Sequence, residues 1–369
     1  MLKVIAVVVL GWMTLYGDQQ CNYNPRMTRY LVQKQFFKEA NFNLLDVGAS
    51  GGIESYWKAF GNDLAGFGFD PLVKECEKLN ASNTYPNFRY VPCFVIAEDE
   101  KLDNYRSSPT AGFYAMTGAF PRSSASKMMQ NLKIDYIKEV FNSGETVVLS
   151  QDRISLDSFC LKKGMKTVDF IKVDTDGADY AVLRGADKLL REDNVLGILI
   201  EMNFNEELHP HANSWRNIDH YLAEKGFSLF DLSIRKYTKG DLPGKFVYRI
   251  PAQTTHGQIT QGDAFYLKDF VQMKKMGKQI PTVQLVKMAC LQEIFGLPDC
   301  AAELLLAFRD QLSSVIDVDH CLDLLTEDVG LYKSYETHLQ EFKKDPTQFY
   351  PSITSRTQSR IINYLKRFF

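Results

Sequence analysis

Short apolar runs alternate with amphipathic stretches from Asn43 onward, and this alternation constrains the fold more than any other feature of the chain. Strand-length apolar runs separated by helix-length stretches are typical of βαβ units, whose parallel strands are buried on both faces. The pattern predicts an α/β fold with a mostly parallel seven-stranded sheet and flanking helices. The expected strands are residues 44–47, 66–69, 88–95, 169–173, 196–201, 228–232 and 264–267. The expected helices are residues 53–60, 72–80, 154–163, 178–190 and 215–225.

The last two predicted strands follow each other with no clear helix between them, which favours an antiparallel pair at one edge. After Asp269 the pattern becomes helical: Thr282 can cap one helix, Asp299 the next, and a third helical stretch covers residues 329–342. The polar segment 99–150 interrupts the sheet pattern, and an insertion of this length favours a lid or binding loop. The predicted regions are an N-terminal segment with an apolar start and a helix, a sheet domain, and a C-terminal helical region: residues 1–42, 43–270 and 271–369.

Both ends of the chain leave two interpretations open. The apolar run 4–10 has the length of a signal-peptide core or a membrane tether, but no small-residue cleavage site follows it, and it can equally be a buried strand or helix. The basic amphipathic tail can bind acidic lipid or pack on its own protein. Its cations are Arg356, Arg360, Lys366 and Arg367. We expect a cytoplasmic protein, with peripheral membrane association as the alternative.

Charge and cysteine usage argue against nucleic-acid binding, a disulfide framework and a zinc knuckle. A formal net charge of −2 offers no electrostatic reason to expect nucleic acid. The seven cysteines never form a Cys-x-x-Cys pair, which fits a reducing compartment better than a disulfide framework or a zinc knuckle.

The first predicted strand runs into a glycine-rich turn, residues 48–52. Gly48, Gly51 and Gly52 allow backbone to approach a ligand closely. Their Gly-x-x-Gly-Gly spacing misses the dinucleotide pattern, and no Lys-Ser/Thr pair follows for a triphosphate, so the turn suits a pyrophosphate poorly. The second strand ends at Asp70, where an acid can hold the ribose hydroxyls of a nucleoside. Alternatively, Asp70 caps the helix that follows.

Farther along, three acidic or basic residues come at the ends of neighbouring strands. Lys172 and Asp174 share one face of their strand because side chains alternate, and Glu201 ends the next strand. All three should therefore face the crevice at the carboxyl edge of the sheet, where open α/β sheets bind ligands. Asp176 and Asp179 follow in the same turn.

The segment from Ser155 to Ala186 resembles the signature of the FkbM family of methyltransferases. Asp176 and Asp179 stand where the family usually has Glu, which keeps the charge and shortens the reach by one methylene. The resemblance covers roughly residues 43–269. The matching positions are Leu156-Asp157-Ser158, Lys172, Asp174, Gly177, Val182-Leu183 and Gly185-Ala186. The resemblance extends back to Asp46-Val47-Gly48-Ala49 and forward through Glu201, Gly226-Phe227 and Gly262-Asp263-Ala264, and it covers the terminal helices only loosely.

The resemblance implies a Rossmann-like class I methyltransferase fold, S-adenosylmethionine as methyl donor and a hydroxyl acceptor, often on a sugar, glycan or natural product. By this analogy Asp70 takes the donor's ribose, while Lys172, Asp174 and Glu201 face the reacting centre. The donor's amino-acid end is expected at Asp46, Gly48, Ala49, Gly51 and Gly52.

A hydroxyl is a weak nucleophile, so a base near it should help. Our hypothesis is that Asp174 accepts the proton and that Lys172 orients this carboxylate or stabilises developing negative charge. In a rival version Asp174, Glu201 and Asn203 hold a divalent cation, although no metal is expected. The candidate acceptor contacts are Tyr114 and Arg122 in the insertion, Asp176, and His211 as an alternative base.

Other functions remain open from the sequence. Asp174-Thr175-Asp176 is an Asp-x-Asp, which in a glycosyltransferase would hold a divalent metal and a nucleotide sugar. That hypothesis leaves the glycine turn and Asp70 unexplained. A non-catalytic scaffold built on a methyltransferase fold is a second alternative, and an oxidoreductase is disfavoured by the glycine spacing.

Overall fold

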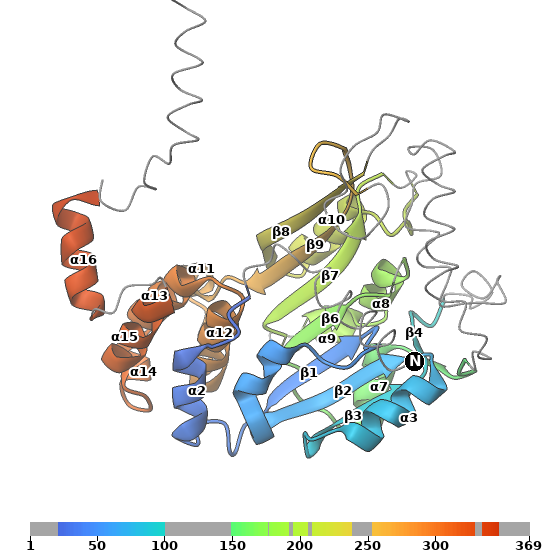
Figure 1. Cartoon of the computed structure of the whole chain (residues 1–369), viewed down its shortest axis with the longest axis horizontal. Helices are drawn as coiled ribbons and strands as arrows, with labels where there is room; N and C mark the ends of the chain where they lie inside the picture. The colour runs from blue at the N-terminus through green and yellow to red at the C-terminus, as the bar shows by residue number, and fades with distance from the viewer. Residues whose placement is uncertain are drawn as a thin grey trace, which may run out of the picture.

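The computed structural model describes residues 21–99, 149–175, 177–191, 195–205, 209–237, 253–328 and 334–346 (Figure 1). The apolar start, most of the insertion and the basic tail lie outside these residues, so the predictions made for them stay predictions. Among the helices in the described ranges, none is both long and apolar enough to cross a membrane.

A twisted seven-stranded sheet forms the centre of the fold, in the order β3-β2-β1-β6-β7-β9-β8. The first five of these strands run parallel, and β9 is antiparallel to both of its neighbours. The mostly parallel, Rossmann-like sheet predicted from the sequence is confirmed. Its strands are β1 (Phe42–Val47), β2 (Leu64–Asp70), β3 (Asn87–Pro92), β6 (Phe170–Val173), β7 (Gly197–Asn203), β8 (Phe227–Tyr237) and β9 (Gln258–Lys268).

One detail of the sheet differs from expectation. The strand predicted over residues 88–95 is broken after Pro92, because β4 (Phe94–Val95) leaves the main sheet and pairs with β5 (Arg153–Ile154). The antiparallel pair predicted at one edge is confirmed: β9 lies inside, between β7 and β8, and β8 forms the edge. β9 is buried along most of its length, as a strand with partners on both sides should be.

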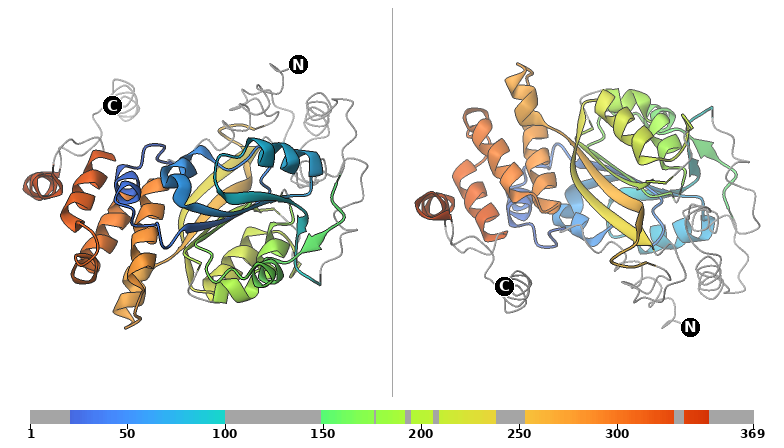
Figure 2. Two further views of the ribbon diagram at one scale, coloured as in Figure 1. Left: turned by 90° about the horizontal axis from the view of Figure 1, so that it is seen from below. Right: turned by 90° about the horizontal axis from the view of Figure 1, so that it is seen from above.

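Helices cover both faces of the sheet (Figure 2). On one face, η1 and α3 pack with aromatic side chains such as Trp57 and Phe170, and on the other face α7 to α10 pack against Leu45 and Ile171. The helix predicted over 53–60 is a 3-10 helix, and the one predicted over 178–190 is two short helices. Their bounds are η1 (Ser55–Asp63), α3 (Val73–Ser82), α7 (Leu156–Lys163), α8 (Asp179–Arg184), α9 (Asp187–Arg191) and α10 (Trp215–Glu224).

The C-terminal helices pack into the same hydrophobic core as the first face of the sheet, together with α2 (Arg26–Gln33), which lies against α12 and α15 (Figure 1). The predicted caps are wrong: Pro281 and Leu297 hold the N-cap positions, and Thr282 and Asp299 lie just inside their helices. These helices are α11 (Phe270–Lys275), α12 (Thr282–Ile294), α13 (Pro298–Ala307), α14 (Arg309–Leu312), α15 (Val318–Asp328) and α16 (Tyr335–Lys344).

Buried ion pairs attach α12 to the rest of the fold. Lys287 Nζ lies 2.7 Å from Asp169 Oδ2, just before β6, and both side chains are almost fully buried. The Glu293 carboxylate accepts hydrogen bonds from the backbone N–H groups of Met27 and Thr28 at the start of α2, at 2.8 and 2.7 Å. The sheet, the first helix and the C-terminal helices therefore share charged as well as apolar contacts.

Candidate functional site

The glycine turn after β1 contacts the end of β6 directly through backbone atoms. Gly48 has a φ of +87°, and a Cβ added there would lie 1.8 Å from the carbonyl oxygen of Asp174. The N–H groups of Gly48 and Ala49 donate to Phe69 O at 2.9 and 3.0 Å, which ties the turn to β2 as well. Gly51 and Gly52 also have positive φ, +82° and +90°. Glycine is therefore required at Gly48 by both conformation and space.

Lys172 lies between two carboxylates at the carboxyl edge of the sheet. Its Nζ is 3.4 Å from Asp46 Oδ1 and 3.5 Å from Asp174 Oδ2. Asp46 is fully buried, and burial raises the pKa of its carboxyl against the opposing attraction of Lys172. The Asp174 side chain is 20% exposed, so it is the member of this trio that a ligand can reach.

Glu54, at the start of η1, joins this group although nothing in the sequence singled it out. Burial raises the pKa of its carboxyl, while the charge of Lys172 lowers it and that of Asp46 raises it again. The turn and the strand ends therefore surround a region rich in carboxylates, two of which lie within 3.5 Å of Lys172 Nζ.

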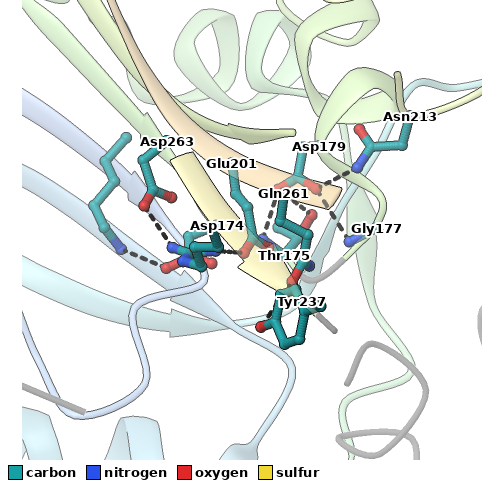
Figure 3. Close-up of polar contacts among 11 residues, drawn as sticks. Asp174, Thr175, Gly177, Asp179, Glu201, Asn213, Tyr237, Gln261 and Asp263 are labelled. Carbon is teal, nitrogen blue, oxygen red and sulfur yellow. Dashed lines mark hydrogen bonds and ion pairs between the residues drawn. The ribbon is translucent and has the colours of Figure 1, made fainter. Parts of the chain in front are cut away.

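A second ion-pair group lies beside the first, on β7, β8 and β9. Arg235 bridges two carboxylates: its Nη1 is 2.5 Å from Glu201 Oε1 and its Nη2 is 2.5 Å from Asp263 Oδ2. Glu201 and Asp263 are register partners, and Figure 3 shows both close to Asp174. Burial opposes the charge of Arg235, but Asp263 and Glu201 outweigh it and raise the pKa of the guanidinium. Glu201 is thus placed at the predicted edge, with Arg235 as its partner.

Asp179 holds the loop that follows Asp174. Its buried carboxylate accepts from the Thr175 N–H (2.8 Å) and hydroxyl (3.0 Å), from the Gly177 N–H (3.0 Å) and from Asn213 Nδ2 (2.8 Å), as Figure 3 shows. Burial, followed by repulsion from Glu201, raises the pKa of this carboxyl to about 6. This aspartate replaces the family's usual Glu, and its role in the structure is to organise the loop.

Asp70 ends β2 beside the glycine turn. Its carboxylate accepts from the N–H of Leu72 at 2.8 Å and is hydrogen-bonded to Ser50, and burial raises its pKa. Leu72 holds the N-cap position of α3, so Asp70 does not cap that helix directly. The side chain instead joins the end of β2 to the turn, through Leu72 and Ser50.

Among the remaining predicted residues that the structure describes, Asn203 lies at this edge, two residues beyond Glu201 on β7. Tyr114, Arg122 and Asp176 lie outside the described residues. His211 is exposed before α10, where its N–H donates to His209 Nδ1 at 3.1 Å. Asn203 ends β7 with its side chain buried. Within the described part of the chain, no group of three or more His, Cys, Asp or Glu is arranged to hold a metal ion.

Among solved structures, the chain resembles precorrin-6y C5,15-methyltransferase from Geobacter metallireducens (10% identity, covering 65% of this chain and 87% of that one, TM-score 0.30). It also resembles a SAM-dependent methyltransferase from Aquifex aeolicus (12% identity, 66% and 92% covered, TM-score 0.27). A third similarity is to the N-terminal domain of EvdMO1 in the presence of SAH and D-fucose (8% identity, 66% and 83% covered, TM-score 0.25).

Sequence comparison gives a sharper result. No curated protein sequence matches the chain significantly. The family model of the methyltransferase FkbM domain matches residues 46–229, from Asp46 at the end of β1 into β8. This span contains the glycine turn, Asp70, Lys172, Asp174, Asp179 and Glu201. Through residues 46–229, the chain belongs to the FkbM family of methyltransferases.

Proposed function

We propose that the protein transfers a methyl group from S-adenosylmethionine to a hydroxyl group of a sugar, glycan or related natural product. The observation that carries this proposal is the position of Lys172 between buried Asp46 and reachable Asp174 at the carboxyl edge of the sheet. Asp174 can act as a base that the neighbouring cation Lys172 holds in place, and the adjacent glycine turn lets a ligand come close to the backbone. This arrangement suits transfer of a methyl group to a hydroxyl.

The residues around the glycine turn fit the methyl donor. S-adenosylmethionine carries positive charge on its sulfonium and its ammonium, and Asp46 and Glu54 are carboxylates at the turn. Asp70 can accept hydrogen bonds from the two ribose hydroxyls. When bound, the donor would supply an activated methyl group, and S-adenosylhomocysteine would leave as a neutral thioether that needs no proton. Gly48, Ala49, Gly51 and Gly52 would allow the donor's amino-acid end to approach the backbone.

The chain's own residues then have distinct tasks. Asp174 accepts the hydroxyl proton, because it is the exposed carboxylate of the Lys172 trio. Lys172 orients that carboxylate, and its second contact to Asp46 fixes its own position. Glu201, held by Arg235, shapes the acceptor side of the same edge. The Arg235 guanidinium already occupies one Glu201 oxygen, so a metal in the rival version would compete with it.

Calorimetric titration tests the donor. The full chain would be titrated with S-adenosylmethionine, S-adenosylhomocysteine, NAD, and a UDP-sugar with manganese. We expect about micromolar binding of the first two, weakened at least about tenfold by Asp70→Ala, since a charged hydrogen-bond acceptor is removed. Asp63→Ala is the matched control, because Asp63 immediately precedes β2 at the opposite end of the same strand. Binding of the UDP-sugar alone would instead support a glycosyltransferase, and no binding at all would support the scaffold hypothesis.

A further inference from the structure

Amide side chains extend the polar face of β7, β8 and β9 beyond the ion pairs. Asn203 and Arg235 are both register partners of Gln261, and Tyr237 is the partner of Gln258 in β9 and of Gln253 in an isolated bridge. Register partners project on the same face of a sheet, and so do residues two apart on one strand. The amide cluster therefore shares a face with Glu201 and Asp263, and consists of Asn203, Gln253, Gln258 and Gln261.

Three amide oxygens in this cluster are buried with no hydrogen-bond partner among the described residues: Asn203 Oδ1, Gln253 Oε1 and Gln258 Oε1. Asn203 and Gln253 are each 5% exposed. A buried oxygen without a hydrogen-bond partner destabilises the fold. Gln261 Oε1 does have a partner, the Tyr237 hydroxyl at 3.4 Å, and Figure 3 shows these two side chains beside Thr175 and Glu201. Unsatisfied acceptors gathered next to the candidate reacting centre indicate a ligand that donates hydrogen bonds.

The chemistry of the cluster favours one class of ligand. A carboxamide presents a donor and an acceptor in one plane, which matches neighbouring hydroxyls on a ring, and the Tyr237 side chain adds an aromatic surface. The adjacent ion pairs contain Asp46, Asp174, Glu201 and Asp263 against only Lys172 and Arg235, so an anionic ligand would meet an excess of negative charge.

The spacing along the sheet suits a sugar. Asn203 lies two residues beyond Glu201 on β7, which is about 7 Å along a strand. That span is about the width of a pyranose ring. A ring held by the amide cluster could place one hydroxyl toward Asp174 while its neighbours donate to the unpartnered oxygens.

We propose that the amide cluster is the acceptor subsite, and that it binds an uncharged saccharide through adjacent ring hydroxyls. This inference rests on the proposed function and specifies its substrate class. It assigns Asn203, Gln253 and Gln258 to substrate positioning, which differs from the metal-ligand role that the sequence left open for Asn203.

Saturation-transfer NMR on the full chain with S-adenosylhomocysteine tests the subsite. The probes are methyl α-D-glucopyranoside, methyl α-D-galactopyranoside, the anionic methyl glucuronoside, and phenol. We expect the neutral glycosides to bind, the glucuronoside to bind at least about tenfold more weakly, and phenol not to compete. Asn203→Leu and Gln258→Leu should each weaken glycoside binding about tenfold, the effect of about one lost hydrogen bond of 1.4 kcal/mol. Their unfolding midpoints should stay equal or rise, because each removes an unpartnered oxygen.

Gln292→Leu is the matched control, because Gln292 in α12 is also 5% exposed with an unpartnered Oε1 but lies in the helical core. It should leave glycoside binding unchanged. Binding of neither glycoside, glucuronoside binding as tight as the neutral probes, phenol as the preferred ligand, or unchanged binding in both cluster variants would each overturn the inference. Calorimetry with S-adenosylhomocysteine is read separately, so failure of the donor site and failure of the acceptor subsite are distinguishable.

Discussion

Gly48 and Asp174 are in backbone contact: a Cβ on Gly48 would lie 1.8 Å from the Asp174 carbonyl oxygen. The turn that we propose faces the methyl donor therefore rests directly on the strand end that carries the candidate base. Neither segment can shift without the other, because Asp174 N–H also donates to Val47 O at 2.9 Å. The geometry of the donor side and the acceptor side is coupled through this contact.

The first prediction concerns this contact. Gly48→Ala should destabilise the fold by about 3 kcal/mol or more and abolish binding of S-adenosylhomocysteine, because backbone must move to admit the methyl group and the residue has positive φ. Gly51→Ala is the control: Gly51 has nearly the same φ, but nothing lies within 4 Å of its added Cβ, so only about 1–2 kcal/mol of strain is expected. Urea denaturation and calorimetry measure both effects. Equal losses in the two variants would refute the steric argument.

Asp174→Asn separates chemistry from binding. We expect turnover to fall by about 10²–10⁴, the usual contribution of a positioned general base. The affinity for S-adenosylhomocysteine should change less than about twofold, because the Asn keeps the shape of the side chain and Asp46 still pairs with Lys172. The measurement is transfer of isotopically labelled methyl to the saccharide that binds best. Retention of near-full turnover in a well-folded variant would exclude Asp174 as the base.

The local part of the site could be predicted from the sequence. Asp46, Lys172 and Asp174 lie at the ends of neighbouring parallel strands, and parallel strands deliver their carboxyl ends to one edge in a way that short-range patterns reveal. Asp46 pairs in register with Lys172, as that rule requires. The partners of Lys172 were not determined, since the sequence does not show that Lys172 bridges the two acids.

The acceptor side could not be predicted, because it depends on long-range register. The pairing of β8 with β9 shifts register twice: Phe230 is an extra residue in β8, and Thr260 is an extra residue in β9. Each shift changes which side chains face the site. The sequence pattern ended this strand at residue 232, so Arg235 and Tyr237 were missed. Asp263 was noted only as part of a resemblance. Its partnership with Glu201 follows from β9 lying between β7 and β8, a choice no local pattern encodes.

Arg235→Met tests the bridge between Glu201 and Asp263. Removing the guanidinium leaves two buried carboxylates facing each other, and we expect a loss of about 3–5 kcal/mol at neutral pH. The loss should shrink as the pH falls, because burial already raises the pKa of Asp263 and protonation relieves the repulsion. Arg309→Met, which breaks the exposed pair with Asp319, should cost less than about 1 kcal/mol. A pH-independent loss in Arg235→Met would mean that packing rather than charge explains the effect.

Lys287→Met tests whether the C-terminal helices are integral to the sheet. The variant leaves Asp169 buried without its 2.7 Å partner, so the free energy of unfolding should fall by about 3–5 kcal/mol in one cooperative transition. Lys78→Met, at an exposed pair with Glu75, serves as control and should change stability by less than about 1 kcal/mol. Two separate transitions, with only the later or earlier one shifted, would show that the helices and the sheet unfold independently.

Asp179 should make the stability of the fold depend on pH, in the direction that its raised pKa predicts. Its folded-state pKa is raised to about 6, above the value of about 4 for an unfolded aspartate, so the folded state binds this proton more tightly. The group's contribution to stability is therefore complete below about pH 4 and is lost as the pH rises through about 6.

As the pH rises between these limits, we expect the ionisation of Asp179 to lower the free energy of unfolding by up to about 3 kcal/mol. The Asp179→Asn variant should lack this pH-dependent loss. The variant should also be less stable at every pH, because its NH₂ group would take the place of one of the two carboxylate oxygens. In one orientation the NH₂ would face the Thr175 N–H, and in the other it would face the N–H donors of Gly177 and Asn213. Urea denaturation of both proteins at intervals across this range measures the difference. Parallel curves would show that Asp179 does not titrate there, and that the loop after Asp174 is held by a carboxylate that stays ionised throughout.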